Sequence, residues 1–103
     1  MSDSPWIVHA SLDDAELTID DLCRLCAVSP AWVHERVGAG LLAPRTAGGA
    51  PAAAWRFDAA LLARVRVMRG IERDFDAVPE LAALVADLQD EVRRLRRLLG
   101  HAR

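Results

Sequence analysis

Two closely spaced helix-start signals constrain the fold of residues 18–45 more than any other feature of this chain. Thr18 with Asp21 three residues later has the pattern of a capping box, in which a hydroxyl and a carboxylate satisfy free N–H groups of a first helical turn. Ser29 followed by Pro30 is the second signal, because Ser is a preferred N-cap and Pro suits the first helical position. Only a short turn fits between the two helices. The segment therefore predicts a helix-turn-helix.

The residues on either side predict a small β wing and a third helix. Apolar and polar residues alternate over Trp6–Leu12 and again over Trp55–Phe57, which indicates two short strands that could pair. Between them, Thr46–Ala54 is rich in Gly, Ala and Pro and predicts a flexible loop. Asp58 is the expected N-cap of the third helix. The residues expected on the core side of the helices are Ile19, Leu22, Cys23, Cys26, Leu61, Leu62, Val65, Met68 and Ile71.

A heptad pattern runs along the last predicted helix, from about Ala77 to Leu99. Val at three of the four a positions with Leu at every d position favours a parallel two-stranded coiled coil, whereas acidic residues placed before basic ones also suit an antiparallel pair. A helix that instead closes its own domain's core is the alternative. The residues expected to mediate dimerisation are Leu81, Val85, Leu88, Val92, Leu95 and Leu99. We therefore expect a winged helix-turn-helix domain over residues 1–74 and a dimerisation or packing helix over residues 75–103.

The charge distribution limits the partners of the chain. Its 103 residues carry a formal net charge of −2, with −4 on residues 1–54 and +2 on residues 55–103. A DNA-binding surface needs cations to neutralise phosphates, and the predicted helix-turn-helix has few. No apolar stretch is long enough to cross a membrane, and no basic region precedes an apolar run at the N-terminus. We expect a cytoplasmic protein.

Catalytic and metal-binding patterns are weak. Cys23 and Cys26 have the spacing of a redox pair or half a metal site, but no second ligand pair follows, so two buried apolar side chains are the favoured interpretation. His9, His34 and His101 are scattered along the chain. We expect no catalytic site, no metal and no cofactor, and hence a protein that is not an enzyme.

The order of these elements resembles the MerR-type winged helix-turn-helix, and within it the chaperone modulatory protein CbpM family. The residues that carry the resemblance are Ile19–Cys23, Val28–Ser29, Val37–Arg45, Trp55–Asp58 and Arg64–Arg69, followed by a Leu-rich end. The chain departs from the family pattern at Ala27, where Gly is frequent, in its longer wing loop, and over Asp74–Pro79. The resemblance covers roughly residues 12 to 99.

This resemblance implies a function in protein binding. CbpM-like proteins bind the J-domain of a DnaJ-like co-chaperone and block its work with a DnaK-type chaperone. An acidic surface would steer such a basic partner, and the residues expected to bind it are Glu16, Asp20, Asp21, Trp32 and Glu35. The alternative is a MerR-like DNA-binding transcriptional regulator. Its second helix would offer only His34 and Arg36 to the bases, and its best phosphate contacts would be Arg66, Arg69 and Arg73.

Overall fold

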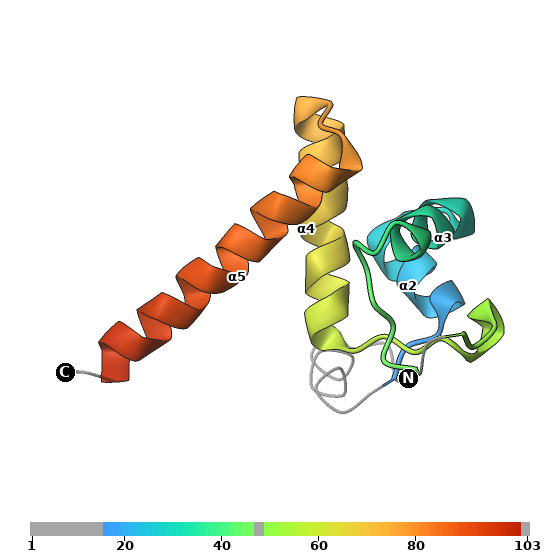
Figure 1. Ribbon diagram of the computed structural model, residues 1–103, viewed down its shortest axis with the longest axis horizontal. Helices are drawn as coiled ribbons and strands as arrows, with labels where there is room; N and C mark the ends of the chain where they lie inside the picture. Colours follow the sequence, from blue (N-terminus) through green and yellow to red (C-terminus); the bar gives the residue numbers. More distant parts are fainter. Residues whose placement is uncertain (1–15, 47–48, 102–103) are drawn as a thin grey trace, which may run out of the picture. The chain divides into compact units, whose positions relative to one another are not determined.

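The computed structural model describes residues 16–46 and 49–101 (Figure 1). Its helices are α2 (Ile19–Cys26), α3 (Pro30–Gly38), the short 3₁₀ helix η1 (Ala52–Ala54), α4 (Ala59–Phe75) and α5 (Pro79–His101). Contacts divide the chain into two compact units, Met1–Arg66 and Val67–Arg103, so the division falls inside α4. The strand predicted over Trp6–Leu12 lies outside the described residues.

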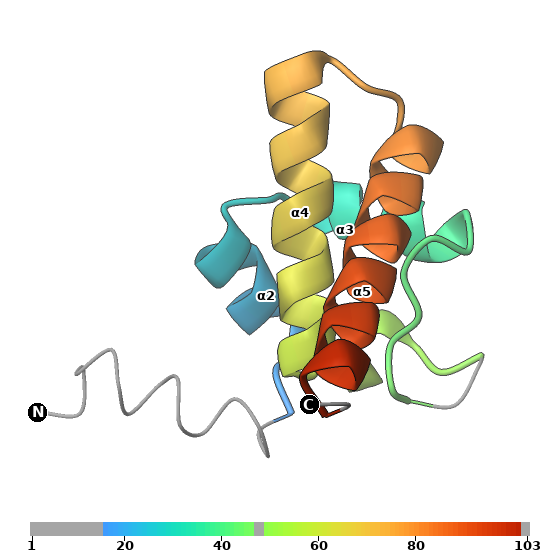
Figure 2. The ribbon, with the colours of Figure 1, turned by 90° about the vertical axis from the view of Figure 1, so that its left-hand side faces the viewer.

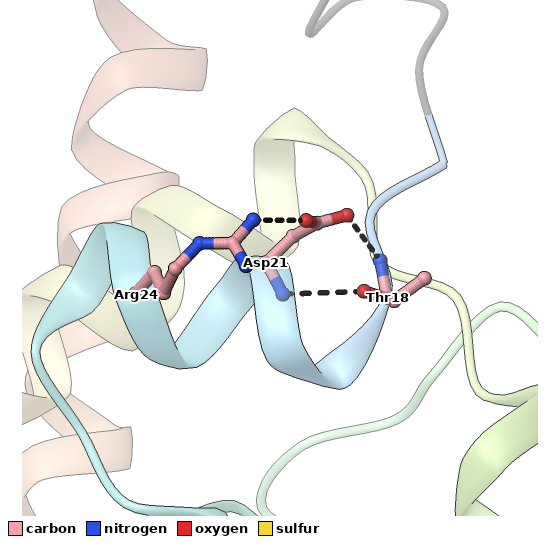
Figure 3. A network of polar contacts seen from close by, with 3 residues as sticks. All are labelled: Thr18, Asp21 and Arg24. Carbon is pink, nitrogen blue, oxygen red and sulfur yellow. Dashed lines mark hydrogen bonds and ion pairs between the residues drawn. The ribbon is translucent and has the colours of Figure 1, made fainter.

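Helix α2 begins as the sequence predicts. The Thr18 hydroxyl accepts a hydrogen bond from the backbone N–H of Asp21 at 3.2 Å, and the Asp21 carboxylate accepts one from the backbone N–H of Thr18 at 3.0 Å (Figure 3). This reciprocal pair is a capping box. The other oxygen of Asp21 forms an ion pair with Arg24 at 2.7 Å. Two free N–H groups of the first turn are thereby satisfied by side chains within the helix itself.

The turn between α2 and α3 is made by a left-handed residue. Ala27 has a φ of 56°, and the N–H of Val28 donates to the carbonyl of Cys23 at 3.2 Å. Helix α3 then starts at the predicted position, because the Ser29 hydroxyl accepts from the backbone N–H of Trp32 at 3.0 Å and Pro30 occupies the first turn. The helix-turn-helix prediction is confirmed.

The β wing expected from the sequence is not confirmed. Leu17 and Phe57 form a single antiparallel bridge, with N···O distances of 2.7 and 2.8 Å, and no longer strand occurs in residues 16–46 or 49–101. The strand predicted over Trp55–Phe57 is reduced to the bridge at Phe57 and a hydrogen bond from the backbone N–H of Arg45 to the carbonyl of Arg56 at 2.8 Å. The N–H of Trp55 instead donates to the carbonyl of Ala52 and closes η1. Part of the predicted flexible loop is this 3₁₀ turn.

The core of the first unit contains four of the nine predicted apolar residues, namely Leu22, Cys26, Leu62 and Val65. Its buried side chains come from the bridge, from α2, α3 and α4, and from the segment after α3: Leu17, Leu22, Cys26, Val33, Leu42, Phe57, Leu62 and Val65. Phe57, Leu22 and Val33 are fully buried. The Arg64 side chain on α4 donates to the carbonyl of Leu41 at 3.0 Å and ties the segment after α3 to α4. Burial of these apolar groups is the main stabilising contribution to the unit.

Helix α4 starts at its predicted cap and extends to Phe75. The Asp58 carboxylate accepts from the backbone N–H of Leu61 at 2.9 Å. Gly70 does not interrupt the helix, which ends where Asp76 adopts a φ of 53°. Asp is one of the few non-Gly residues that adopt this left-handed conformation readily, so the reversal of the chain after α4 occurs there (Figure 2).

Helix α5 buries small residues and exposes large ones. Val78 caps the helix, because its carbonyl accepts from the N–H groups of Leu81 and Ala82, both at 3.1 Å, and Pro79 follows. The start therefore lies two residues after the expected Ala77. Ala82, Ala83 and Ala86 are buried, as is Met68 on α4. The predicted dimerisation residues are exposed by 44–69%, apart from the half-buried Val85: Leu81, Leu88, Val92, Leu95 and Leu99.

Candidate interaction surface of the helix-turn-helix

Two of the predicted protein-binding residues are exposed and unengaged. Glu16 and Asp20 lie just before and within the first turn of α2, and neither forms a hydrogen bond or an ion pair with another residue that the structure describes. Both carboxylates are therefore available to a cationic partner. The dipole of α2 also favours negative charge at this end.

Asp21 is already satisfied inside the fold. Its carboxylate accepts a hydrogen bond from the backbone N–H of Thr18 and forms an ion pair with Arg24. The hydrogen bond from Thr18 is the largest of the influences that hold the pKa of Asp21 below its ordinary value, and the Arg24 charge lowers it further. Asp21 shapes the start of α2 and contributes charge to the surface, but its oxygens have partners.

Trp32, Glu35 and Arg36 form a cluster on α3. The Arg36 guanidinium lies over the Trp32 ring, 4.3 Å from its centroid, and donates to Glu35 at 2.8 Å. Only 8% of Arg36 is exposed, and Trp32 is half-buried. The sequence interpretation treated Trp32 and Glu35 as contact residues and missed this cluster, although side chains four residues apart on a helix are neighbours. Arg36 thus supports α3 and is not presented on its surface.

Four of the other five Arg residues of the first unit also have partners within the fold. Arg24 pairs with Asp21 and Arg45 with Asp58, whereas Arg56 donates to two backbone carbonyls and Arg64 to one. Arg66 is exposed and, among the residues that the structure describes, has no such partner. In the first unit, a phosphate-binding surface would have to be built largely from cations that the fold already uses.

A row of aromatic rings links α3 to the segment that replaces the predicted wing. The ring centroids of His34 and Trp55 are 5.0 Å apart, and those of Trp55 and Phe57, which form a T-shaped pair, are 6.5 Å apart. The indole N–H of Trp55 donates to the carbonyl of Ala50 at 3.1 Å. His34 is exposed on α3, so one of the two groups expected to read bases is engaged with Trp55. Sequence patterns could not find this contact, because its partners are distant in the chain.

The environments of the two cysteines are those of small apolar side chains. Cys26 is buried with its Sγ 3.9 Å from the carbonyl of Leu62. Desolvation raises the pKa of the half-buried Cys23 thiol, and the nearby Asp20 charge raises it further, whereas reactive or metal-binding cysteines have lowered pKa values. Within the described ranges, no group of three or more His, Cys, Asp or Glu side chains could hold a metal ion.

Capped α2, the left-handed turn at Ala27 and Pro-started α3 define a helix-turn-helix protein. Residues 17–101 match the family model described as MerR HTH family regulatory protein, so the chain belongs to this family. Searches of curated proteins and of solved structures gave no match. Among the described residues, no helix combines the length and the apolar character needed to cross a membrane.

Proposed function

We propose that this protein is an inhibitory modulator of a DnaJ-like co-chaperone, which binds the J-domain and blocks its use of a DnaK-type chaperone. The observation that carries the proposal is the use of cations inside the helix-turn-helix unit. Arg36, the cation of α3, is buried under Trp32 and paired with Glu35. Glu16 and Asp20 meanwhile remain exposed without ion-pair partners among the described residues. The surface suits a basic partner better than a phosphate backbone.

The side chains of α3 are poorly suited to reading DNA. A reading helix must place several donors against base edges while nearby cations hold the phosphates. Here the exposed polar side chains of α3 include His34 against Trp55 and Glu35 against Arg36. Releasing Arg36 to DNA would remove its contact with Trp32 and leave the exposed Glu35 carboxylate near the phosphates without its ion-pair partner. Both changes oppose DNA binding.

The proposed mechanism is steric. A J-domain has a basic helical face, and a protein that covers this face prevents its contact with the DnaK-type chaperone. Complementary charge accelerates the encounter and sets its orientation. The proposal involves no bond-making step and no cofactor, and it places the protein in the cytoplasm with its chaperone partners.

A DNA-binding regulator is the second candidate. Membership of a family of helix-turn-helix regulatory proteins favours it, as does exposed Arg66 on α4. In this alternative Arg66, together with cations released from surface ion pairs, would contact the phosphate backbone. Such binding would fall steeply with salt because each neutralised phosphate releases counterions.

We further propose that the chain forms a homodimer through α5. A 23-residue helix is about 34 Å long at 1.5 Å per residue. Ala82, Ala83 and Ala86 of this helix are buried. More than two fifths of the surface of each of four large apolar residues is exposed: Leu81, Leu88, Val92 and Leu95. Soluble monomers rarely expose a continuous apolar stripe of this length, so a second copy is the simplest cover for it.

The proposed function is tested by mixing the purified chain with the purified J-domain of a DnaJ-type co-chaperone. We expect a complex by titration calorimetry, tighter at low than at high salt, and loss of J-domain stimulation of the ATPase of the DnaK-type chaperone. Absence of a complex at high micromolar concentration and low salt would exclude this function. A gel shift with promoter DNA and a steep salt slope, without J-domain binding, would establish the alternative.

A further inference from the structure

The connection between α4 and α5 exposes an aromatic side chain at the end of a helix. Phe75, the last residue of α4, is 72% exposed, more than any other large apolar residue in the described part of the chain. Val78, three residues later, is 61% exposed. Both belong to the second unit. We refer to residues 74–80 as the α4–α5 tip.

Local features define the backbone at the α4–α5 tip. Asp76 adopts the left-handed conformation that ends α4, and the carbonyl of Val78 accepts two N–H groups from the first turn of α5. Pro79 fixes the next φ angle. Phe75 and Val78 are therefore presented by a short connection between two helices. A preorganised apolar surface binds with less loss of conformational entropy than a mobile one.

Acidic residues flank the two apolar residues in the sequence. Residues 72–80 contain four acids and one Arg, a net charge of −3. The Asp74 carboxylate forms an ion pair with the Arg73 guanidinium, with an N···O distance of 2.9 Å. Asp76 and Glu80 are exposed and have no hydrogen bond or ion pair with another described residue. An apolar centre with an unpaired acidic rim matches a helix that carries apolar residues between Lys or Arg side chains.

We propose that the α4–α5 tip is the surface on which this protein holds the basic helical face of its J-domain partner, an inference that rests on the proposed function. Phe75 and Val78 pack against apolar residues of that helix, and Asp76 and Glu80 pair with its cations. This assignment differs from the acidic start of α2, the surface that the sequence indicates. An exposed aromatic side chain is present at the tip, whereas Trp32 on α3 is half-buried and is covered by the Arg36 guanidinium.

Two matched double variants separate the tip from the start of α2. Asp76→Asn with Glu80→Gln neutralises the tip, and Asp20→Asn with Glu16→Gln neutralises one Asp and one Glu in the same way at the start of α2. Asn is chosen at position 76 because it also tolerates a positive φ. The probe is the purified J-domain, titrated into each full-length variant. We expect the tip variant to bind about tenfold more weakly at low salt and the α2 variant only about twofold more weakly, because Glu16 and Asp20 attract the partner by long-range charge and do not touch it.

A second matched pair tests the apolar anchor. Phe75→Ala is expected to weaken J-domain binding by about thirtyfold, because exposed aromatic anchors often dominate an interface. Leu25→Ala removes an apolar side chain that is 38% exposed on α2 and should leave the affinity unchanged. Circular dichroism and light scattering test whether both variants keep the fold and the oligomeric state of the wild type.

Each remaining outcome contradicts the inference in a recognisable way. If the α2 variants lose affinity and the tip variants do not, the tip inference is wrong and the proposed function stands. If Phe75→Ala changes the oligomeric state, a second copy of the chain covers the tip and the inference is also wrong. If the wild-type protein does not bind the J-domain at all, the proposed function and the tip inference fail together.

Discussion

Replacing Arg36 by Ala distinguishes a structural cation from a DNA-reading one. The guanidinium lies 4.3 Å from the Trp32 centroid and the residue is only 8% exposed. A cation–π contact that is largely removed from water contributes about 2 kcal/mol, and the buried stem adds packing. We therefore expect Arg36→Ala to lower the free energy of unfolding by about 2 kcal/mol and the melting temperature by about 10 °C.

Glu35→Ala is the matched control for this prediction. The Glu35 side chain is 73% exposed, so its ion pair with Arg36 at 2.8 Å is largely screened by solvent. Its loss should lower the free energy of unfolding by less than about 1 kcal/mol. Thermal and guanidinium denaturation, followed by circular dichroism and Trp fluorescence, measure both variants.

An Arg36→Ala variant that keeps the melting temperature of the wild type would contradict a structural role for Arg36. That role is also refuted if the variant is as stable as the wild type but loses binding to DNA, because Arg36 would then act at a nucleic-acid surface. Equal destabilisation by Arg36→Ala and Glu35→Ala would assign the stabilisation to the ion pair and not to the contact with Trp32.

Thr18→Ala should destabilise the protein by about 1 kcal/mol because it removes the hydroxyl half of the capping box. The folded-state pKa of Asp21 lies below its ordinary value of 3.8, so its stabilisation is complete above pH 3.8 and is lost as the pH falls through the lower folded-state pKa. Denaturant unfolding between pH 5 and pH 2 (about the range in which such a group titrates) should show a slightly smaller loss of stability on acidification in the Thr18→Ala variant than in the wild type. The hydroxyl that helps to lower the pKa of Asp21 is removed, whereas the backbone N–H, which has the larger effect, remains. Leu88→Arg should convert the proposed dimer into a monomer in sedimentation equilibrium, because Leu88 is 56% exposed on the apolar side of α5. Asp87→Arg, a charge change at the adjacent exposed position, should leave the molecular mass of the particle unchanged, and a monomeric wild type would contradict the proposed dimer.

The helix starts could be predicted because their interactions are local. Thr18, Ser29 and Asp58 each accept a backbone N–H from three residues later, and this spacing is visible in the sequence. The left-handed Ala27 was harder to predict, because Gly is the usual residue there and only its position between two helices indicates a turn. The expected strand at Trp55–Phe57 failed because η1 closes on Trp55 and a single bridge with Leu17 remains.

The candidate site was predicted less completely than the fold. The sequence identified Glu16 and Asp20 as available carboxylates, and the structure places both on the surface. It also selected Trp32 and Glu35, whose contacts with Arg36 depend on which side of α3 faces the core. The tip was not selected, because an apolar residue such as Phe75 in a short connection looks the same in sequence whether it is buried or exposed.

The sequence by itself therefore determined where the helices begin, part of the core of the first unit and how charge is distributed along the chain. These properties follow from hydrogen bonds within one turn and from helical periodicity. Only the tertiary structure decided which charges remain available, because Arg36 is covered by Trp32, His34 meets Trp55, and Arg64 is held by the carbonyl of Leu41. Whether a side chain is engaged depends on the neighbours that burial brings to it, and a linear pattern of residue types does not contain that information.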